Sequence, residues 1–238
     1  MPTPQPPVFQ APLVVPGLIA VLALIHAVLW FAGENWQVWS LYAFAFIPAR
    51  FGGGETIPYI AGSQYWSMLA HAFLHADAAH LLFNCLWLLI FGTVVARYLG
   101  AWRFLLLSAV SAIAGAVMML ALHWGEMAIM VGASGAVSGL TAAAVPIMYG
   151  AGMRWGTVLA GNASYARHLS LTGLLANRNA LLFAAVWLGI TLFSGATGWI
   201  GNGFLDQASI AWEAHLGGFI AGLAAFYALA RSKSASGV

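Results

Sequence analysis

The feature that most constrains this chain is a series of apolar segments, each close to twenty residues long and almost free of charged side chains. An α-helix needs about 20 apolar residues to cross a bilayer, whereas a membrane β-strand needs about ten and alternates in polarity. Of the 238 residues, 62% are hydrophobic and only 6% are charged. Water cannot be the solvent for most of such a chain, so the sequence predicts an all-α membrane protein.

The apolar pattern predicts six membrane-spanning helices in one domain, residues 13–231, between short tails at 1–12 and 232–238. The expected spans are 13–32, 78–97, 101–123, 134–150, 179–197 and 212–231. The first span is expected to be retained, because the proline-rich residues before it lack the basic residues of a signal peptide. The single cysteine, Cys85, excludes an internal disulfide.

Basic residues predict the orientation of these spans, because cytoplasmic loops carry an excess of Lys and Arg. With a cytoplasmic N-terminus, only Arg50 lies outside. The cytoplasmic side then holds Arg97, Arg103, Arg154, Arg167, Arg178, Arg231 and Lys233. Both termini are therefore expected in the cytoplasm. The net charge of +2 reflects this topology and does not indicate nucleic-acid binding.

Two long loops connect the predicted spans. The first outer loop, about 33–77, is rich in Trp, Tyr, Phe and Pro, which is typical of half-buried structure at the membrane interface. The loop 151–179 is polar enough to lie outside the hydrocarbon, and His168 within it is expected to be solvated. The sequence assigns this second loop no specific function.

Polar residues collect at the predicted outer ends of the spans. His80 and Asn84 lie near the start of the second span, Ser134 opens the fourth, and His215 lies one turn into the sixth. The fourth span has only about 17 residues, so Ser134 should lie below the membrane surface at the end of a loop that dips inward. A serine and a histidine at similar depth form a candidate pair.

Such a pair is suited to acyl transfer, because a neutral imidazole can take the proton of a hydroxyl nucleophile. His215 is the expected base. Asn84, His80 and the backbone N–H of Ser134 are expected to stabilise the oxyanion. The nearest carboxylate in sequence, Glu213, should point to another side of its helix, so the site would be a dyad without a third member.

Three motifs carry a resemblance to a known family. They are His71-Ala-Phe-Leu-His75 followed by His80 and Asn84, then Gly132-Ala-Ser134-Gly135, then Ala214-His215-Leu-Gly217-Gly218 with Gly222. In this order on six predicted spans, they resemble the rhomboid intramembrane serine proteases. The chain departs from the family pattern at Ser138, where an aromatic residue is frequent, and at Trp66-Ser67, where the family has Trp-Arg.

The resemblance implies a six-helix rhomboid-like bundle with a short central fourth helix that starts at the nucleophile. Ser134 would be the nucleophile and His215 the general base, with His80, Asn84 and Ser134 on the oxyanion side. It also implies cleavage of transmembrane protein substrates near the outer boundary of the lipid bilayer, without a cofactor or metal. The fifth span and the loop Trp199 to Ala211 would form the substrate gate and cap. The compact chain indicates a bacterial inner (plasma) membrane.

Other interpretations of the same residues stay open. His71, His75, Asp77 and His80 have a spacing that could bind a metal, although a helix boundary interrupts it. Gly135 and Gly139 match Gly218 and Gly222 in spacing, so close contact between the fourth and sixth spans is expected from packing alone. For the whole chain, the alternatives are a non-catalytic rhomboid-like protein that binds client helices and a transporter with a polar pathway.

Overall fold

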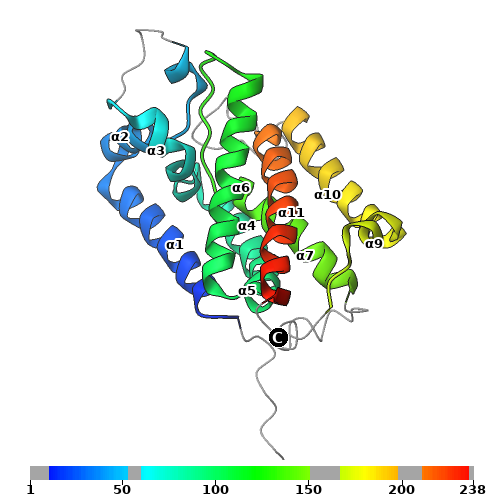
Figure 1. Ribbon diagram of the computed structural model, residues 1–238. Coiled ribbons are helices and arrows are strands. Elements are labelled where there is room, and N and C mark those ends of the chain that lie inside the picture. The colour runs from blue at the N-terminus through cyan, green and yellow to red at the C-terminus, as the bar shows by residue number, and fades with distance from the viewer. Residues whose placement is uncertain (1–10, 53–59, 151–166, 198–210, 236–238) are drawn as a thin grey trace, which may run out of the picture.

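The computed structural model describes residues 11–52, 60–150, 167–197 and 211–235, and these residues are almost entirely helical (Figure 1). The elements in chain order are α1 (Val14–Ala32), α2 (Glu34–Phe44), η1 (Pro48–Phe51), α3 (Ser63–Ala70), η2 (His71–Phe73), α4 (Ala78–Trp87), η3 (Leu88–Gly92), α5 (Thr93–Leu99), α6 (Ala101–Leu122), α7 (Ser134–Gly150), α9 (Leu171–Ala176), α10 (Arg178–Thr197) and α11 (Trp212–Ala235). In the described part, the only β-pairing is an isolated bridge between Phe46 and Met130.

Four helical stretches of the described residues are long and apolar enough to cross a membrane. They are Val14–Ala32, Ala78–Leu99, Ala101–Leu122 and Trp212–Ala230. The second of these runs through α4, the π-helical turn η3 and α5 without a break. The two remaining predicted spans are also helical: α7 has 17 residues, and α10 contains the shorter apolar helix Arg178–Thr191.

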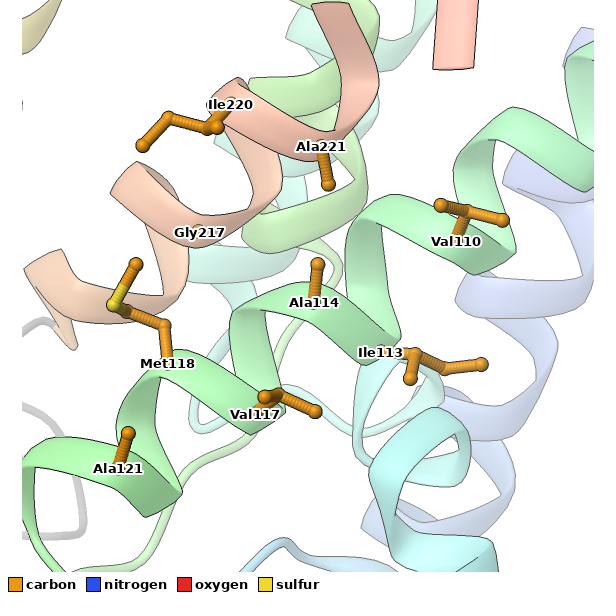
Figure 2. A pocket seen from close by; sticks show the side chains of 9 residues that line it. All are labelled: Val110, Ile113, Ala114, Val117, Met118, Ala121, Gly217, Ile220 and Ala221. Atoms are coloured by element: carbon orange, nitrogen blue, oxygen red, sulfur yellow. The ribbon is translucent and has the colours of Figure 1, made fainter. Parts of the chain in front are cut away.

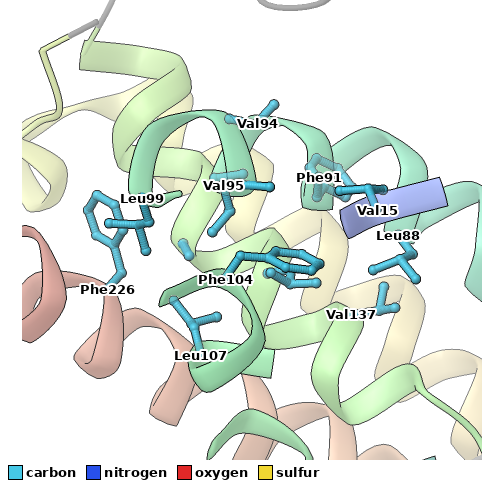
Figure 3. Close-up of a cluster of buried hydrophobic side chains, with 14 of the residues drawn as sticks. Val15, Leu88, Phe91, Val94, Val95, Leu99, Phe104, Leu107, Val137 and Phe226 are labelled. Atoms are coloured by element: carbon cyan, nitrogen blue, oxygen red, sulfur yellow. The ribbon is translucent and has the colours of Figure 1, made fainter. Parts of the chain in front are cut away.

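Helix α7 lies in the middle of the fold, largely hidden behind α6 and α11 (Figure 1). Every residue from Val137 to Met148 is buried. Because α7 consists mainly of small and apolar residues on all sides, it satisfies the pattern of a helix surrounded by protein. Its neighbours in the core include Leu88 and Phe91 of η3, Phe104 of α6 and Phe226 of α11 (Figure 3).

Glycines bring α7 and α11 into direct backbone contact. A Cβ on Gly218 would overlap the backbone of Gly135, and a Cβ on Gly222 would overlap the backbone of Gly139. Lipid provides no hydrophobic drive for helix association, so membrane helices associate through close packing of small residues. The contact that the glycine spacing predicted between these two segments is confirmed.

The first long loop is half-buried structure, as its composition predicted. It contains α2, η1 and α3, and Trp66 Nε1 donates a 2.7 Å hydrogen bond to the carbonyl of Ala43. The Arg50 guanidinium donates to the carbonyls of Tyr42 and Ala45, each at 2.7 Å. These bonds satisfy carbonyl groups that the end of α2 leaves without helical partners. Ser67, where the family motif has Arg, is fully buried.

The expectation that His168 is solvated is wrong. Its Nδ1 lies 2.6 Å from the Tyr98 hydroxyl, and its ring packs edge-on against Phe226 with centroids 5.3 Å apart. The segment returns to the bundle because the N–H of Leu169 donates to the carbonyl of Pro146 at 2.9 Å. Burial lowers the pKa of His168 below its ordinary value.

Candidate active site

Ser134 is the first residue of α7, and backbone hydrogen bonds hold the loop before it against the first long loop. Phe46 and Met130 exchange backbone hydrogen bonds of 3.0 and 2.9 Å, and the N–H of Gly132 donates to the carbonyl of His71 at 2.9 Å. Met130 and Ala133 are both buried. The end of this loop is therefore packed inside the protein, and residues of the first long loop hold it in position.

Gly132 places this loop directly against His80. A Cβ on Gly132 would lie 2.6 Å from His80 Cε1 and 2.7 Å from Nε2, which leaves no room for a side chain. Its φ of 113° is also a conformation that residues with a Cβ rarely adopt. Both observations restrict position 132 to glycine. Because this position has no side chain, the His80 ring can pack directly against the backbone two residues before Ser134.

The start of α4 carries His80 and Asn84 on one face. Asp77 caps this helix, because its Oδ1 accepts a 2.7 Å hydrogen bond from the N–H of His80. Asn84 is buried, and its Nδ2 donates to the carbonyl of His80 at 2.9 Å. That bond uses one of the two N–H groups of the amide and holds the side chain toward the beginning of the helix.

His215 lies in the first turn of α11, close to these groups. His80 is near enough to His215 to interact with it electrostatically. The residues next to the candidate pair also meet, because a Cβ on Gly135 would lie 3.5 Å from the carbonyl oxygen of Ala214. The starts of α4, α7 and α11 therefore gather at one end of the bundle, which we call the Ser134 end.

The Nδ1 atom of His215 is buried and has no hydrogen-bond partner among the described residues. Glu213 points elsewhere, as the sequence indicated, and binds His123. Within the described part of the chain, no carboxylate therefore orients the His215 ring through its second nitrogen.

Two further histidines pack beside the site. His71 Nδ1 lies 2.9 Å from the carbonyl of Ser67, and the His75 ring meets the His80 ring edge-on with centroids 5.2 Å apart. Burial lowers the pKa of His71 to about 4 and that of His75 to about 3, so both are neutral at physiological pH. No group of three or more His, Cys, Asp or Glu in the described chain could hold a metal ion.

The sequence did not predict the link between His123 and Glu213. His123 caps the end of α6, and its Nε2 lies 2.7 Å from Glu213 Oε1 at the start of α11. One signal was available: a histidine at the predicted end of the third span and a glutamate at the start of the sixth lie on the same side of the membrane. Nothing in their spacing pairs two residues so far apart in the chain.

An apolar groove of about 640 Å³ lies between α6 and α11 (Figure 2). Its lining residues are Val110, Ile113, Ala114, Val117, Met118, Ala121, Gly217, Ile220 and Ala221. None of them carries a polar side chain. This groove supplies no group that could act on a peptide bond, and the polar residues at the Ser134 end remain the candidate site.

Comparison with known proteins identifies the family of this chain. The sequence model described as the rhomboid domain matches residues 62–232, which is most of the chain. The chain belongs to the rhomboid family. The match includes α3 through α10 and most of α11, so it contains all four candidate residues, Ser134, His215, His80 and Asn84. Rhomboid membership and the four apolar helices identify a multi-pass membrane protein.

Two relatives illustrate how far the rhomboid similarity extends. "Rhomboid protease GlpG" of Yersinia pestis (strain Pestoides F) is 30% identical over 160 residues, which cover 67% of this chain and 46% of that protein. YdcA of Bacillus subtilis (strain 168), also named for the rhomboid family, is 37% identical over 81 residues, 34% of this chain and 40% of that protein. The matched part thus spans less than half the length of these relatives.

Proposed function

We propose that this rhomboid protein is an intramembrane serine endopeptidase, with Ser134 as nucleophile and His215 as general base. The observation that carries the proposal is the convergence of three helix starts at the Ser134 end. Gly132 contacts the His80 ring, and Gly135 contacts Ala214, the residue before His215. A serine at the start of a buried helix and a histidine at the start of the helix packed against it are the two groups that acyl transfer requires.

In the proposed reaction, Ser134 Oγ attacks the carbonyl carbon of the substrate peptide bond while His215 takes the hydroxyl proton. His215 then gives this proton to the leaving amine, and an acyl-enzyme remains on Ser134. A water molecule that His215 deprotonates attacks the ester, and His215 then returns the proton to Ser134 Oγ as the ester bond breaks and the second product leaves. Because no described carboxylate partners His215 Nδ1, the pair acts as a dyad.

The oxyanion of each tetrahedral intermediate needs hydrogen-bond donors that are already in place. The first turn of α7 leaves backbone N–H groups without helical partners, including that of Ser134. The side chains of Asn84 and His80 are the other proposed donors. Loss of one such donor typically lowers the rate of an acyl-transfer enzyme by about 10²- to 10³-fold.

The proposed topology has six membrane helices in residues 13–231, cytoplasmic tails, and the Ser134 end near the outer face of an inner (plasma) membrane. It counts α7 and α10 as spans in addition to the four long apolar helices. At about 1.5 Å per residue, α7 is roughly 25 Å long, shorter than a hydrocarbon core of about 30 Å. Cleavage would therefore occur below the outer surface. Most of the proposed cap, Trp199 to Ala211, lies outside the described residues.

The proposed substrates are transmembrane proteins. A peptide bond inside a helix is covered by the helix's own hydrogen bonds and side chains, so the substrate must unwind locally before Ser134 can reach it. We therefore expect small or helix-breaking residues at and after the cleaved position. No cofactor is needed for this chemistry.

The test is cleavage of a reporter transmembrane segment by the purified protein in liposomes, with Ser134→Ala and His215→Ala as the variants. Both should abolish cleavage. The matched control is Ser108→Ala on α6, because Ser108 is also buried in a span but donates to its own helix at Phe104. That variant should cleave at the wild-type rate.

A client-binding protein or a transporter predicts a different result. In either case the wild-type protein would leave a panel of helix-unstable segments intact, and Ser134 would not react with a fluorophosphonate. This combination of results would refute the proposal that the protein is a protease.

A further inference from the structure

Glu213 is an ionisable residue buried in the first turn of α11. Burying a carboxylate in a membrane helix is costly unless a partner compensates its charge. The partner is His123, whose Nε2 lies 2.7 Å from Glu213 Oε1. Because His123 ends α6, this pair joins the end of one span to the start of another.

A second carboxylate engages the other ring nitrogen of His123. Glu126 Oε2 lies 2.7 Å from Nδ1, and the N–H of Glu126 donates to the His123 carbonyl at 2.9 Å. A neutral imidazole has one N–H to donate, whereas the imidazolium has two. Contact with two carboxylates therefore favours the cation, and the hydrogen bonds that His123 donates to Glu213 and Glu126 raise its pKa.

The two carboxylates differ in their surroundings. The Glu126 side chain is 62% exposed, whereas that of Glu213 is 8% exposed. Exposed ion pairs contribute little to stability, and solvent screens them. The bond to Glu213 should therefore hold the helices, while Glu126 mainly supports the charge on His123. Among the described residues, these two are the titratable groups that face His123.

The position of Glu213 relates it to the proposed base. An α-helix turns about 100° per residue, so residues 213 and 215 project from nearly opposite sides of α11. Fixing Glu213 against α6 therefore sets the rotation of this turn and the direction in which His215 projects. In this turn the Ala211 carbonyl accepts from the N–H of Ala214 at 3.0 Å, whereas the N–H of His215 is farther away at 3.4 Å.

We propose that Glu213, held by His123, is a positioning residue that orients the His215 imidazole for proton transfer with Ser134. The need for such a residue follows from the unpartnered Nδ1 of His215, which no described side chain orients directly. The inference rests on the proposed function, because it assigns a role toward the proposed base.

The test compares Glu213→Gln with the matched control Glu126→Gln, since each removes one carboxylate from the same histidine. Glu213→Gln should lower kcat for the reporter segment about 10-fold or more with KM changed less than about 2-fold, because a misdirected base impairs chemistry and not binding. Glu126→Gln should change kcat less than about 2-fold. Thermal unfolding in detergent should show that all variants remain folded.

A pH profile supplies a measurement that does not depend on the buried glutamate surviving substitution. Raising the pH deprotonates the wild-type His123 and removes one of its two donors, so kcat should fall on the alkaline side. In His123→Ala, on a partly exposed residue, this alkaline limb should be absent and kcat uniformly low. A change that only loosens the fold would not remove the limb.

The outcomes separate this inference from the proposed function. If the wild type cleaves and Glu213→Gln matches Glu126→Gln in kcat and in pH profile, the positioning role is refuted while the protease stands. Retention of the alkaline limb in His123→Ala would also refute it. If the wild type does not cleave the reporter and Ser134 does not react with a fluorophosphonate, the proposed protease function is refuted, and the positioning role is refuted with it.

Discussion

Substitution of Gly132 by alanine should separate backbone strain from damage to the site, because Gly33 provides a matched control. Both glycines have positive φ, 113° at Gly132 and 90° at Gly33, and alanine in such a conformation costs about 1–3 kcal/mol. Around Gly33 a Cβ would meet no atom within 4 Å, whereas at Gly132 it would lie 2.6 Å from His80 Cε1. Overpacking of this kind costs about another 1–3 kcal/mol.

The overlap also sets the expected effect on activity. Carbon atoms pack at about 3.5–4.0 Å, so relief of a 2.6 Å contact needs a shift of about 1 Å by His80 or by the loop that leads into Ser134. A displacement of that size in a catalytic arrangement can reduce the rate about 10²-fold. Gly132→Ala should therefore lose about 10²-fold in kcat, and Gly33→Ala should lose none.

The assay is the initial rate of reporter cleavage in liposomes, corrected for the folded fraction from thermal unfolding in detergent. Both variants should unfold at lower temperature than the wild type, Gly132→Ala more so. If Gly132→Ala cleaved as fast as Gly33→Ala per folded molecule, the close contact between Gly132 and His80 would not position the site, and the reasoning would be wrong.

Two further predictions concern stability. Gly222→Ala should destabilise the protein strongly, because the new Cβ overlaps the Gly139 backbone. Gly189→Ala on α10 should instead stabilise the protein by up to about 1 kcal/mol, because a Cβ on Gly189 would meet no atom within 4 Å and alanine favours a helix more than glycine does. Equal unfolding temperatures for the two variants would contradict this. Burial lowers the pKa of His71 from 6.5 to about 4. The contribution of neutral His71 to the free energy of unfolding is therefore fully present above pH 6.5. About 3 kcal/mol of stability is lost as the pH falls toward 4. Unfolding at stepped pH should show this loss, and His71→Gln should reduce the slope.

The positions of the helices could be predicted because apolar length determines them. The segment expected at 134–150 is helix α7, Ser134–Gly150, and the third predicted span, 101–123, is α6, Ala101–Leu122. A run of apolar residues in lipid has no alternative to a helix, since every backbone group must find its partner within the segment. The paired glycines also predicted that α11 is the neighbour of α7, because their four-residue spacing can be read directly from each segment.

Contacts that depend on tertiary placement could not be predicted. His168 lies in a polar loop, and only the return of that loop to Pro146 places it, half-buried, beside Tyr98. The bond between His123 and Glu213 joins residues 90 positions apart, with no periodicity to relate them.

The candidate site was predictable in its residue types but not in its construction. A serine and histidines at the predicted starts of spans identified Ser134, His80 and His215 as candidates. The support that Gly132 and the His71 carbonyl give to the loop before Ser134 depends on backbone conformation and appears only in three dimensions.

The backbone contact between α7 and α11 also has a consequence for how freely this sequence can vary. At Gly139, Gly218 and Gly222, even one added methyl group overlaps main-chain atoms, which cannot rotate away as a side chain does. Apolar positions on the outer face of α10, such as Leu182 and Ile190, are more than half exposed and should accept apolar side chains of many shapes. In a saturation mutagenesis screen, tolerance to substitution should therefore differ between the faces of the helices. The least tolerant positions should form a narrow stripe along these glycines, whatever their distance from Ser134.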